Sequence, residues 1–236
     1  MYQSKGLIAW TNCLSGDYRQ SIIELKEVLA AAKKLSDEFP EDTRFQYDLW
    51  AFRRRIGIAY DKSGNFTQAI GNLEKSLSKI ENLRKSSPPD AGYKRNASIT
   101  RLALGQTYLN YRQPQKALAF LADAREASEN LLESDGENGE TIADLAAIYG
   151  ALGAALTQTD EFTAGLSMQE KSLEFFNRSL AKSPANTEIK QNFAEILKKT
   201  AETCARLAER QNSENAATYR EKEKIFLEQS RRITEK

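Results

Sequence analysis

The side chains that most often perform acid–base, nucleophilic or metal chemistry are scarce in this chain of 236 residues. Histidine, the commonest general base and metal ligand, does not occur. The two cysteines, Cys13 and Cys204, lie near opposite ends of the sequence and do not have the spacing of a zinc site. The glutamates at 126, 129 and 133 have the three- and four-residue spacing of a solvated helix face. We therefore expect a protein that is not an enzyme, with no catalytic residue, cofactor or metal.

Composition also argues against a polyanionic partner. Lysine and arginine total 34 against 33 aspartates and glutamates, a net charge of +1, which gives no long-range attraction to nucleic acid or to a membrane. The apolar run near the N-terminus is too short for a signal peptide, and the longest uncharged stretch, 145–159, is too short to span a bilayer. Two distant cysteines fit a reducing compartment. These features predict a cytoplasmic protein that does not bind nucleic acid or membranes.

The elements that would position a binding site recur every 48 residues. One column holds small residues: Ala9, Gly57, Gly105, Gly153 and Ala201. A second holds helix-breaking residues, and a third, two places later, holds residues that cap helix N-termini: Pro40, Pro88, Gly136 and Pro184, then Asp42, Asp90, Asn138 and Asn186. A further polar column, Asp48, Asn96, Asp144 and Asn192, recurs in the same way, so we assign it to architecture. Each repeat is predicted to open at its capping residue.

Within each repeat the apolar residues recur at three and four, which is the period of an amphipathic helix. Short breaks at 63–65 and 111–114 divide the repeats into two helices each, and strand-like alternation is absent. The sequence predicts an all-α chain of about five antiparallel helix pairs. Their approximate bounds are 1–41, 42–89, 90–137, 138–185 and 186–236. We expect one repeat domain over 1–236, since a repeat array is held together by contacts between neighbours.

The repeats resemble the tetratricopeptide repeat (TPR) family. Two of them carry the family signature best, with Ile56, Gly57, Tyr60, Ala69, Leu73 and Ser76 in one and Leu104, Gly105, Tyr108, Ala117, Leu121 and Ala124 in the next. The resemblance implies an α-solenoid with a right-handed superhelical twist. The family repeat has 34 residues, so this one is longer by two heptads, which keep an apolar stripe nearly in line while each helix lengthens. Long repeats of this kind resemble arrays in bacterial signalling proteins, often after a serine/threonine kinase domain.

The resemblance also implies where a partner would bind, because the family lines its inner groove with the first helix of each pair. The matching positions are Trp10, Arg54, Ile58, Asp61, Lys62, Leu102, Gln106, Leu109, Asn110, Ala154 and Gln158. One subgroup grips a C-terminal carboxylate with basic residues and an asparagine, but Ile58 and Leu102 replace two of those positions. We therefore predict a scaffold that holds a peptide or helix of a partner protein in side-chain pockets, as an accessory region of a signalling or assembly complex.

Bland alternatives exist for several of these positions. Trp10 could cover the exposed end of the core, and Leu102 and Leu109 could be packing residues. In the run 53–55 only Arg54 is expected to face the groove, because successive helical residues point about 100° apart.

The chain ends leave alternatives for the whole protein open. Met1 is in phase with Leu49, so we expect a segment upstream. The last helix carries Tyr219, Phe226 and Ile233 seven apart, which fits a capping helix or a seam with a second chain. A homo-oligomerising spacer with weak self-association, and the non-catalytic C-terminal region of a larger kinase, are therefore the alternatives to the peptide-binding scaffold.

Overall fold

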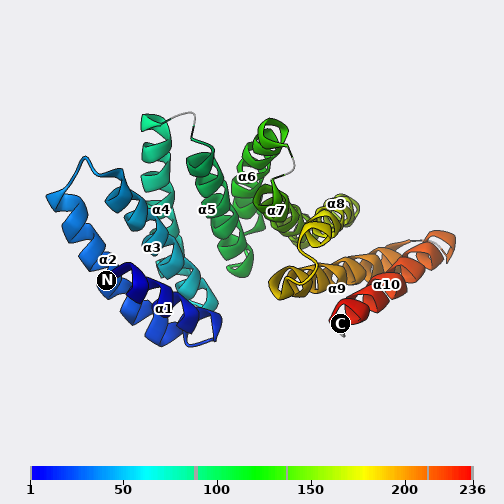
Figure 1. Cartoon of the computed structure of the whole chain (residues 1–236). Coiled ribbons are helices and arrows are strands. Elements are labelled where there is room, and N and C mark those ends of the chain that lie inside the picture. Colours follow the sequence, from blue (N-terminus) through cyan, green and yellow to red (C-terminus); the bar gives the residue numbers. More distant parts are fainter. Residues whose placement is uncertain (1, 88–89, 137, 212, 235–236) are drawn as a thin grey trace. The chain divides into compact units, whose positions relative to one another are not determined.

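The computed structural model describes residues 2–87, 90–136, 138–211 and 213–234, and this part of the chain contains α-helices and no strands (Figure 1). Pro88 and Met1, which entered the sequence predictions, lie outside the described residues. The helices are α1 (Tyr2–Leu14), α2 (Tyr18–Glu38), α3 (Thr43–Lys62), α4 (Phe66–Ser86), α5 (Ala91–Asn110), α6 (Pro114–Asp135), α7 (Gly139–Gln158), α8 (Phe162–Lys182), α9 (Thr187–Arg210) and α10 (Ser213–Thr234).

The helices keep the 48-residue period of the sequence. The first helices α3, α5, α7 and α9 begin at residues 43, 91, 139 and 187, and the second helices α2, α4, α6 and α8 begin at 18, 66, 114 and 162. Each first helix from α3 onwards follows its predicted capping residue. Asp42, Asp90, Asn138 and Asn186 all accept a hydrogen bond from a backbone N–H in the first turn of the helix that follows. The all-α prediction of paired helices is confirmed.

The turn inside each pair is the same structure in four repeats. Gly16, Gly64, Arg112 and Asp160, again 48 apart, have φ of 93°, 78°, 57° and 65°, which is the left-handed region. In each turn the next residue donates its backbone N–H to the carbonyl five residues earlier, as Asn65 does to Tyr60 at 2.9 Å. This closes the first helix as a Schellman motif and aims the chain back along it. Two of the four positions therefore carry a residue with a Cβ in a conformation that favours glycine.

Contacts between Cα atoms group the chain into two compact units, residues 1–113 and 114–236, and the boundary falls at the turn between α5 and α6. In the first unit α3 packs on α1, α2, α4 and α5, so neighbouring first helices touch one another. In the second unit α7 packs on α8 and α9, and α6 packs on α7. The expectation of a single domain over 1–236 stays a prediction.

The glycine column marks the crossing of the two helices in a pair. A Cβ on Gly57 would lie 2.6 Å from Cγ of Leu73, which is fully buried, and a Cβ on Gly153 would lie 2.5 Å from Cγ of Gln169. Real Cβ atoms do not approach so closely, hence only glycine permits this spacing of α3 with α4 and of α7 with α8. A buried serine adds a hydrogen bond across each crossing: Ser76 Oγ donates to the carbonyl of Trp50 at 2.9 Å, and Ser172 Oγ to that of Ala146 at 2.6 Å.

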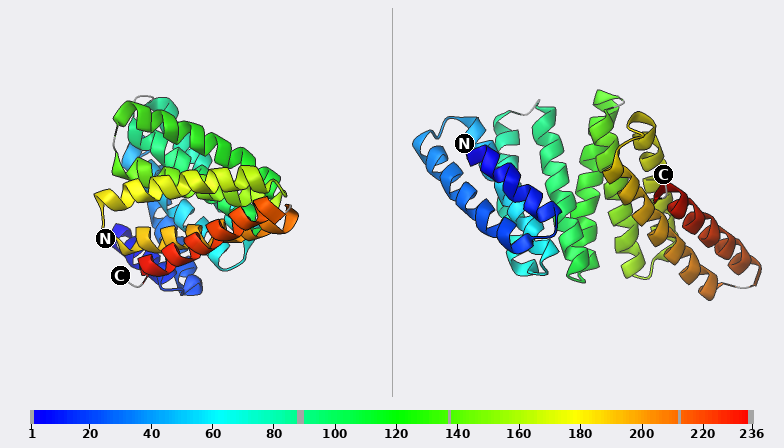
Figure 2. Two further views of the ribbon diagram at one scale, coloured as in Figure 1. Left: turned by 90° about the vertical axis from the view of Figure 1, so that its right-hand side faces the viewer. Right: turned by 60° about the horizontal axis from the view of Figure 1, so that its bottom comes forward.

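The last helix lies alongside α9 in the second unit (Figures 1 and 2). Its stripe of Tyr219, Phe226 and Ile233 packs on the core: Tyr219 and Phe226 meet a cluster that includes Phe162 and Leu207, and Phe226 and Ile233 meet one that includes Leu197. Within the described residues, this stripe is spent on the chain's own core. No helix in the described ranges combines the length and apolar character needed to cross a membrane.

Candidate functional site

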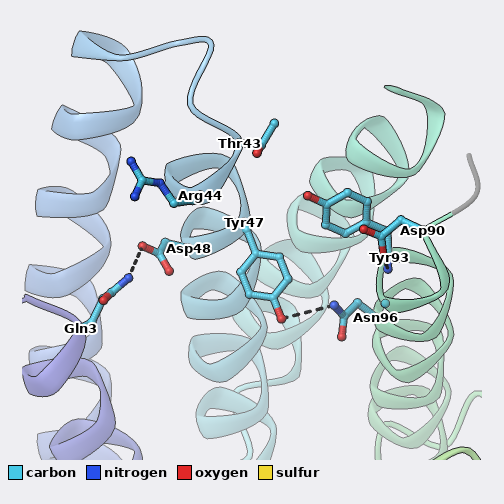
Figure 3. Close-up of a pocket in the computed structure, with 9 residues that line it drawn as sticks. Gln3, Thr43, Arg44, Tyr47, Asp48, Asp90, Tyr93 and Asn96 are labelled. Carbon is cyan, nitrogen blue, oxygen red and sulfur yellow. Dashed lines mark hydrogen bonds between the residues drawn. The ribbon is translucent and has the colours of Figure 1, made fainter. Parts of the chain in front are cut away.

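A pocket of about 510 Å³ opens in the first unit where the N-terminal ends of three successive first helices meet (Figure 3). Helix α1 contributes one side chain, and the first two turns of α3 and α5 contribute most of the others. The lining residues are Gln3, Thr43, Arg44, Tyr47, Asp48, Asp90, Gly92, Tyr93 and Asn96. Because equivalent ends of stacked helices form it, the pocket is a direct product of the repeat.

Two tyrosines give the pocket an aromatic surface. Tyr47, whose exposed fraction is 36%, lies with its ring centroid 4.8 Å from that of the buried Trp50 and 6.4 Å from that of Tyr93. Asn96 Nδ2 donates to the Tyr47 hydroxyl at 3.3 Å, a contact visible in Figure 3. The Tyr47 ring is therefore held in place from α5 while part of it stays open to solvent.

Asp48 supplies a carboxylate beside the Tyr47 ring. Tyr2 donates its hydroxyl to Asp48 Oδ2, and Gln3 Nε2 donates to the same oxygen at 3.0 Å. Burial, reinforced by this hydrogen bond and by the charge of Asp48, raises the pKa of Tyr2, so it stays a neutral donor. Both contacts use Oδ2, and Oδ1 accepts no hydrogen bond from the residues that the structure describes.

The two capping aspartates near the pocket differ in their surroundings. Asp42, at the start of α3, forms a two-pronged ion pair in which Arg44 Nη2 lies 2.6 Å from Oδ2 and Nε lies 3.0 Å from Oδ1. The hydrogen bond from the Arg44 side chain is the main reason that the pKa of Asp42 is lowered. Asp90, at the start of α5, accepts from the backbone N–H of Tyr93 at 3.0 Å, and the position equivalent to Arg44 is Gly92. In the described part of the chain, Asp90 makes no ion pair.

Some of the groove residues predicted from sequence come together further along α3 and α5. Asn110 Nδ2 donates to both carboxylate oxygens of Asp61, at 3.0 and 3.1 Å. Burial raises the pKa of Asp61, and the hydrogen bond from Asn110 partly offsets this effect. Leu102 and Leu109 are buried between helices. This pair and these leucines thus serve contacts within the first unit.

The remaining predicted residues are more accessible. Lys62 and Gln106 are exposed, Arg54 and Ile58 are half-buried, and the half-buried Trp10 lies under the guanidinium of Arg55 at 5.9 Å. Arg55, expected on a solvated helix face, is instead half-buried, and burial lowers its pKa.

Two of the predicted positions belong to the second unit. Ala154, half-buried, and Gln158, exposed, both lie on α7.

Sequence reasoning missed the pocket, although one signal for it was present. It was the polar column at 48 and 96, which the repeat period led us to assign to architecture. Asp48 and Asn96 do bridge neighbouring first helices, through Tyr2 and Tyr47 respectively, and both also line the pocket. A polar column at the open ends of long first helices can therefore serve packing and recognition together.

The described residues hold no group of three or more histidine, cysteine, aspartate or glutamate side chains placed to bind a metal ion. Cys13 and Cys204 are buried free thiols, and burial raises the pKa of both. The chemistry that the pocket offers is hydrogen bonding, aromatic contact and negative charge.

No protein-family model matches the chain, and a search of curated proteins found no match. Solved structures do match over 98% of it. BtubC (BKLC) from P. vanneervenii is 17% identical with a TM-score of 0.67 over 79% of its own length. The TPR-like repeats of a putative Podosopora anserina kinesin light chain are 19% identical with a TM-score of 0.61 over 94% of theirs, and a point variant of that protein is 17% identical with a TM-score of 0.62 over 93%. With ten described helices arranged in pairs, the chain therefore has the all-α solenoid fold of TPR-like repeat proteins.

Proposed function

We propose that this chain is a protein-interaction scaffold that binds a segment of a partner protein on the face formed by α1, α3 and α5, called here the first-helix face. The observation that carries the proposal is the pocket at one end of this face, which three successive first helices line together. A partner segment lying across the helices would contact several repeats at once, which suits an extended or helical peptide better than a small metabolite.

The composition of this face supports recognition by side-chain pockets. It offers the Tyr47 ring, the Asp48 carboxylate, the half-buried Arg54 and Ile58, and the exposed Gln106. A clamp for a C-terminal carboxylate would need basic and amide groups, but Ile58 is apolar and Leu102 is buried. The proposal is for a non-catalytic role, as an accessory region of a signalling or assembly complex in the cytoplasm.

A capture experiment with charge-matched variants tests the proposal. The full chain would be immobilised beside a first-helix variant, Lys62→Glu with Gln106→Glu, and a control with the same charge change on α4, Lys75→Glu with Asn82→Glu. All four residues are exposed, so the melting temperatures should stay close to that of the parent.

We expect a protein from the native lysate to bind the parent and the α4 control but not the first-helix variant. Equal capture by all three proteins would refute the use of this face.

A second candidate function, self-association, is favoured by an apolar strip on α1. Leu7, Ile8 and Leu14 are 60%, 61% and 70% exposed, although Ile56, one repeat after Ile8, is buried against α2. Exposed strips of this kind often mark interfaces. Light scattering during size-exclusion chromatography, over a range of concentrations, would show a dimer that Leu7→Ser with Ile8→Ser abolishes. A monomer at every concentration would remove this candidate.

A further inference from the structure

The pocket at the N-terminal ends of α1, α3 and α5 carries a charge arrangement that the chain itself explains. Asp42 and Asp90 are equivalent residues, 48 apart, and each caps the helix that follows it. At Asp42 the residue two places later is Arg44, whose guanidinium grips the carboxylate at 2.6 and 3.0 Å. At Asp90 the residue two places later is Gly92, so the same carboxylate geometry lacks its arginine.

The rest of the pocket adds what a guanidinium needs. Asp48 Oδ1 accepts no hydrogen bond from described residues, and the rings of Tyr47 and Tyr93 stand between the two carboxylates (Figure 3). The Arg44 side chain points away from Tyr93 and is already paired with Asp42. Among the lining residues this leaves two carboxylates without an ion pair in the described part of the chain.

We propose that this pocket receives an arginine side chain of the partner segment, which stacks on Tyr47 or Tyr93 and pairs with Asp48 and Asp90. Arginine fits better than lysine, because its planar guanidinium can lie on an aromatic ring and donate to a carboxylate at the same time. Gly92 keeps the entrance to Asp90 open, since even a Cβ there would lie 3.0 Å from Asp90 Oδ1. This inference rests on the proposed scaffold function and adds the chemistry of the segment that is bound.

The chain offers unusually clean variants for the test. Asp90→Asn removes the charge but keeps an N-cap, because Asn138 and Asn186 cap α7 and α9 at the equivalent positions. Asp48→Asn introduces the residue that stands at positions 96 and 192. The matched control is Asp144→Asn with Asp160→Asn, which makes the same charge change in the second unit.

The probe is a phage-displayed library of random peptides about twelve residues long, selected on the full chain. Peptides that bind would be synthesised, and each arginine replaced in turn by citrulline, which keeps the shape and removes the charge. We expect the selected peptides to share one arginine. Affinity should fall about tenfold for Asp48→Asn with Asp90→Asn, about tenfold for the citrulline peptide on the parent, and little further when both changes are combined. The control variant should bind like the parent.

The possible failures separate the two proposals. Peptides that lose affinity for Lys62→Glu with Gln106→Glu but respond neither to the pocket variant nor to citrulline would overturn the arginine pocket and leave the scaffold function standing. Failure to select any peptide, or selection of peptides indifferent to both sets of variants, would overturn both.

Discussion

Gln169 is a polar residue in a column that the other repeats fill with leucine. Leu25, Leu73 and Leu121 are all fully buried at the equivalent positions, and Gln169 itself is 2% exposed. Its side-chain carbonyl, Oε1, is buried and accepts no hydrogen bond in the described part of the chain. We predict that Gln169→Leu stabilises the second unit.

The magnitude follows from three contributions. A buried carbonyl without a partner costs about 1–3 kcal/mol, and ordering a glutamine side chain costs about 0.5–1 kcal/mol more than ordering a leucine. Against these, an imperfect fit of the branched side chain costs up to about 1.5 kcal/mol. Leucine is known to fit beside a glycine here, because Leu73 contacts Gly57 as closely as Gln169 contacts Gly153. The free energy of unfolding should therefore rise by about 1–2 kcal/mol, and the two residues have similar helix propensities.

Urea unfolding followed by circular dichroism, together with hydrogen exchange of the α7 and α8 amides, would measure this change. Exchange is needed because two compact units need not unfold in one transition. The reciprocal variant Leu73→Gln should destabilise α3 and α4 by about 2–4 kcal/mol, since it buries a new amide and removes apolar contact. An unchanged or faster exchange of α8 in Gln169→Leu would refute the reasoning.

Four further predictions concern packing, backbone strain and ionisation. Gly153→Ala should destabilise by at least about 2 kcal/mol, because its Cβ would lie 2.9 Å from a backbone carbonyl, whereas Gly71→Ala, in open space inside α4, should stabilise by about 0.5–1 kcal/mol; urea midpoints shifted in the same direction would contradict this. Arg112→Gly should raise the urea midpoint by relieving a left-handed residue, a gain of about 0.5–1 kcal/mol, and a lower midpoint would show that the side chain matters more than the strain. Burial raises the pKa of Cys204 to about 11, so at about pH 8 a thiol-reactive aromatic disulfide should label it only after unfolding; rapid labelling of the native chain would be inconsistent. Burial and a hydrogen bond with a glutamate of α6 raise the pKa of Tyr149 to about 12, so native stability should fall as the pH rises from about 10 to about 12, because the unfolded chain releases a proton that the native chain keeps; Tyr149→Phe should reduce that fall, and an equal fall in both proteins would argue against this origin.

The secondary structure was readable from sequence because its signals are local. An aspartate or asparagine accepts from the backbone two or three residues ahead, so Asp42 or Asn186 marks the start of a helix wherever the chain goes afterwards. Gly64 likewise closes α3 through its own φ angle. The period multiplies these weak signals, and five repeats read in phase predicted the helix pairs that the structure contains.

The site could be predicted only in part. A family resemblance identifies which helices line the binding face, but the exposure of each side chain depends on how neighbouring helices pack. Thus Asp61 and Asn110, both expected in the groove, hydrogen-bond to each other, and Arg55 rather than Arg54 covers Trp10. Such pairings depend on contacts nearly 50 residues apart along the chain.

By itself the sequence determined the helix pairs, their caps and their turns, and its lack of histidine directed attention from catalysis to binding. Only the tertiary structure brought Gln3, Asp48 and Tyr93 from three helices to one pocket and left Asp90 without the arginine that Asp42 has. The physical reason is range. Capping and turn geometry act over a few residues, whereas a pocket and its unpaired charges exist only after helices 48 residues apart have stacked against each other.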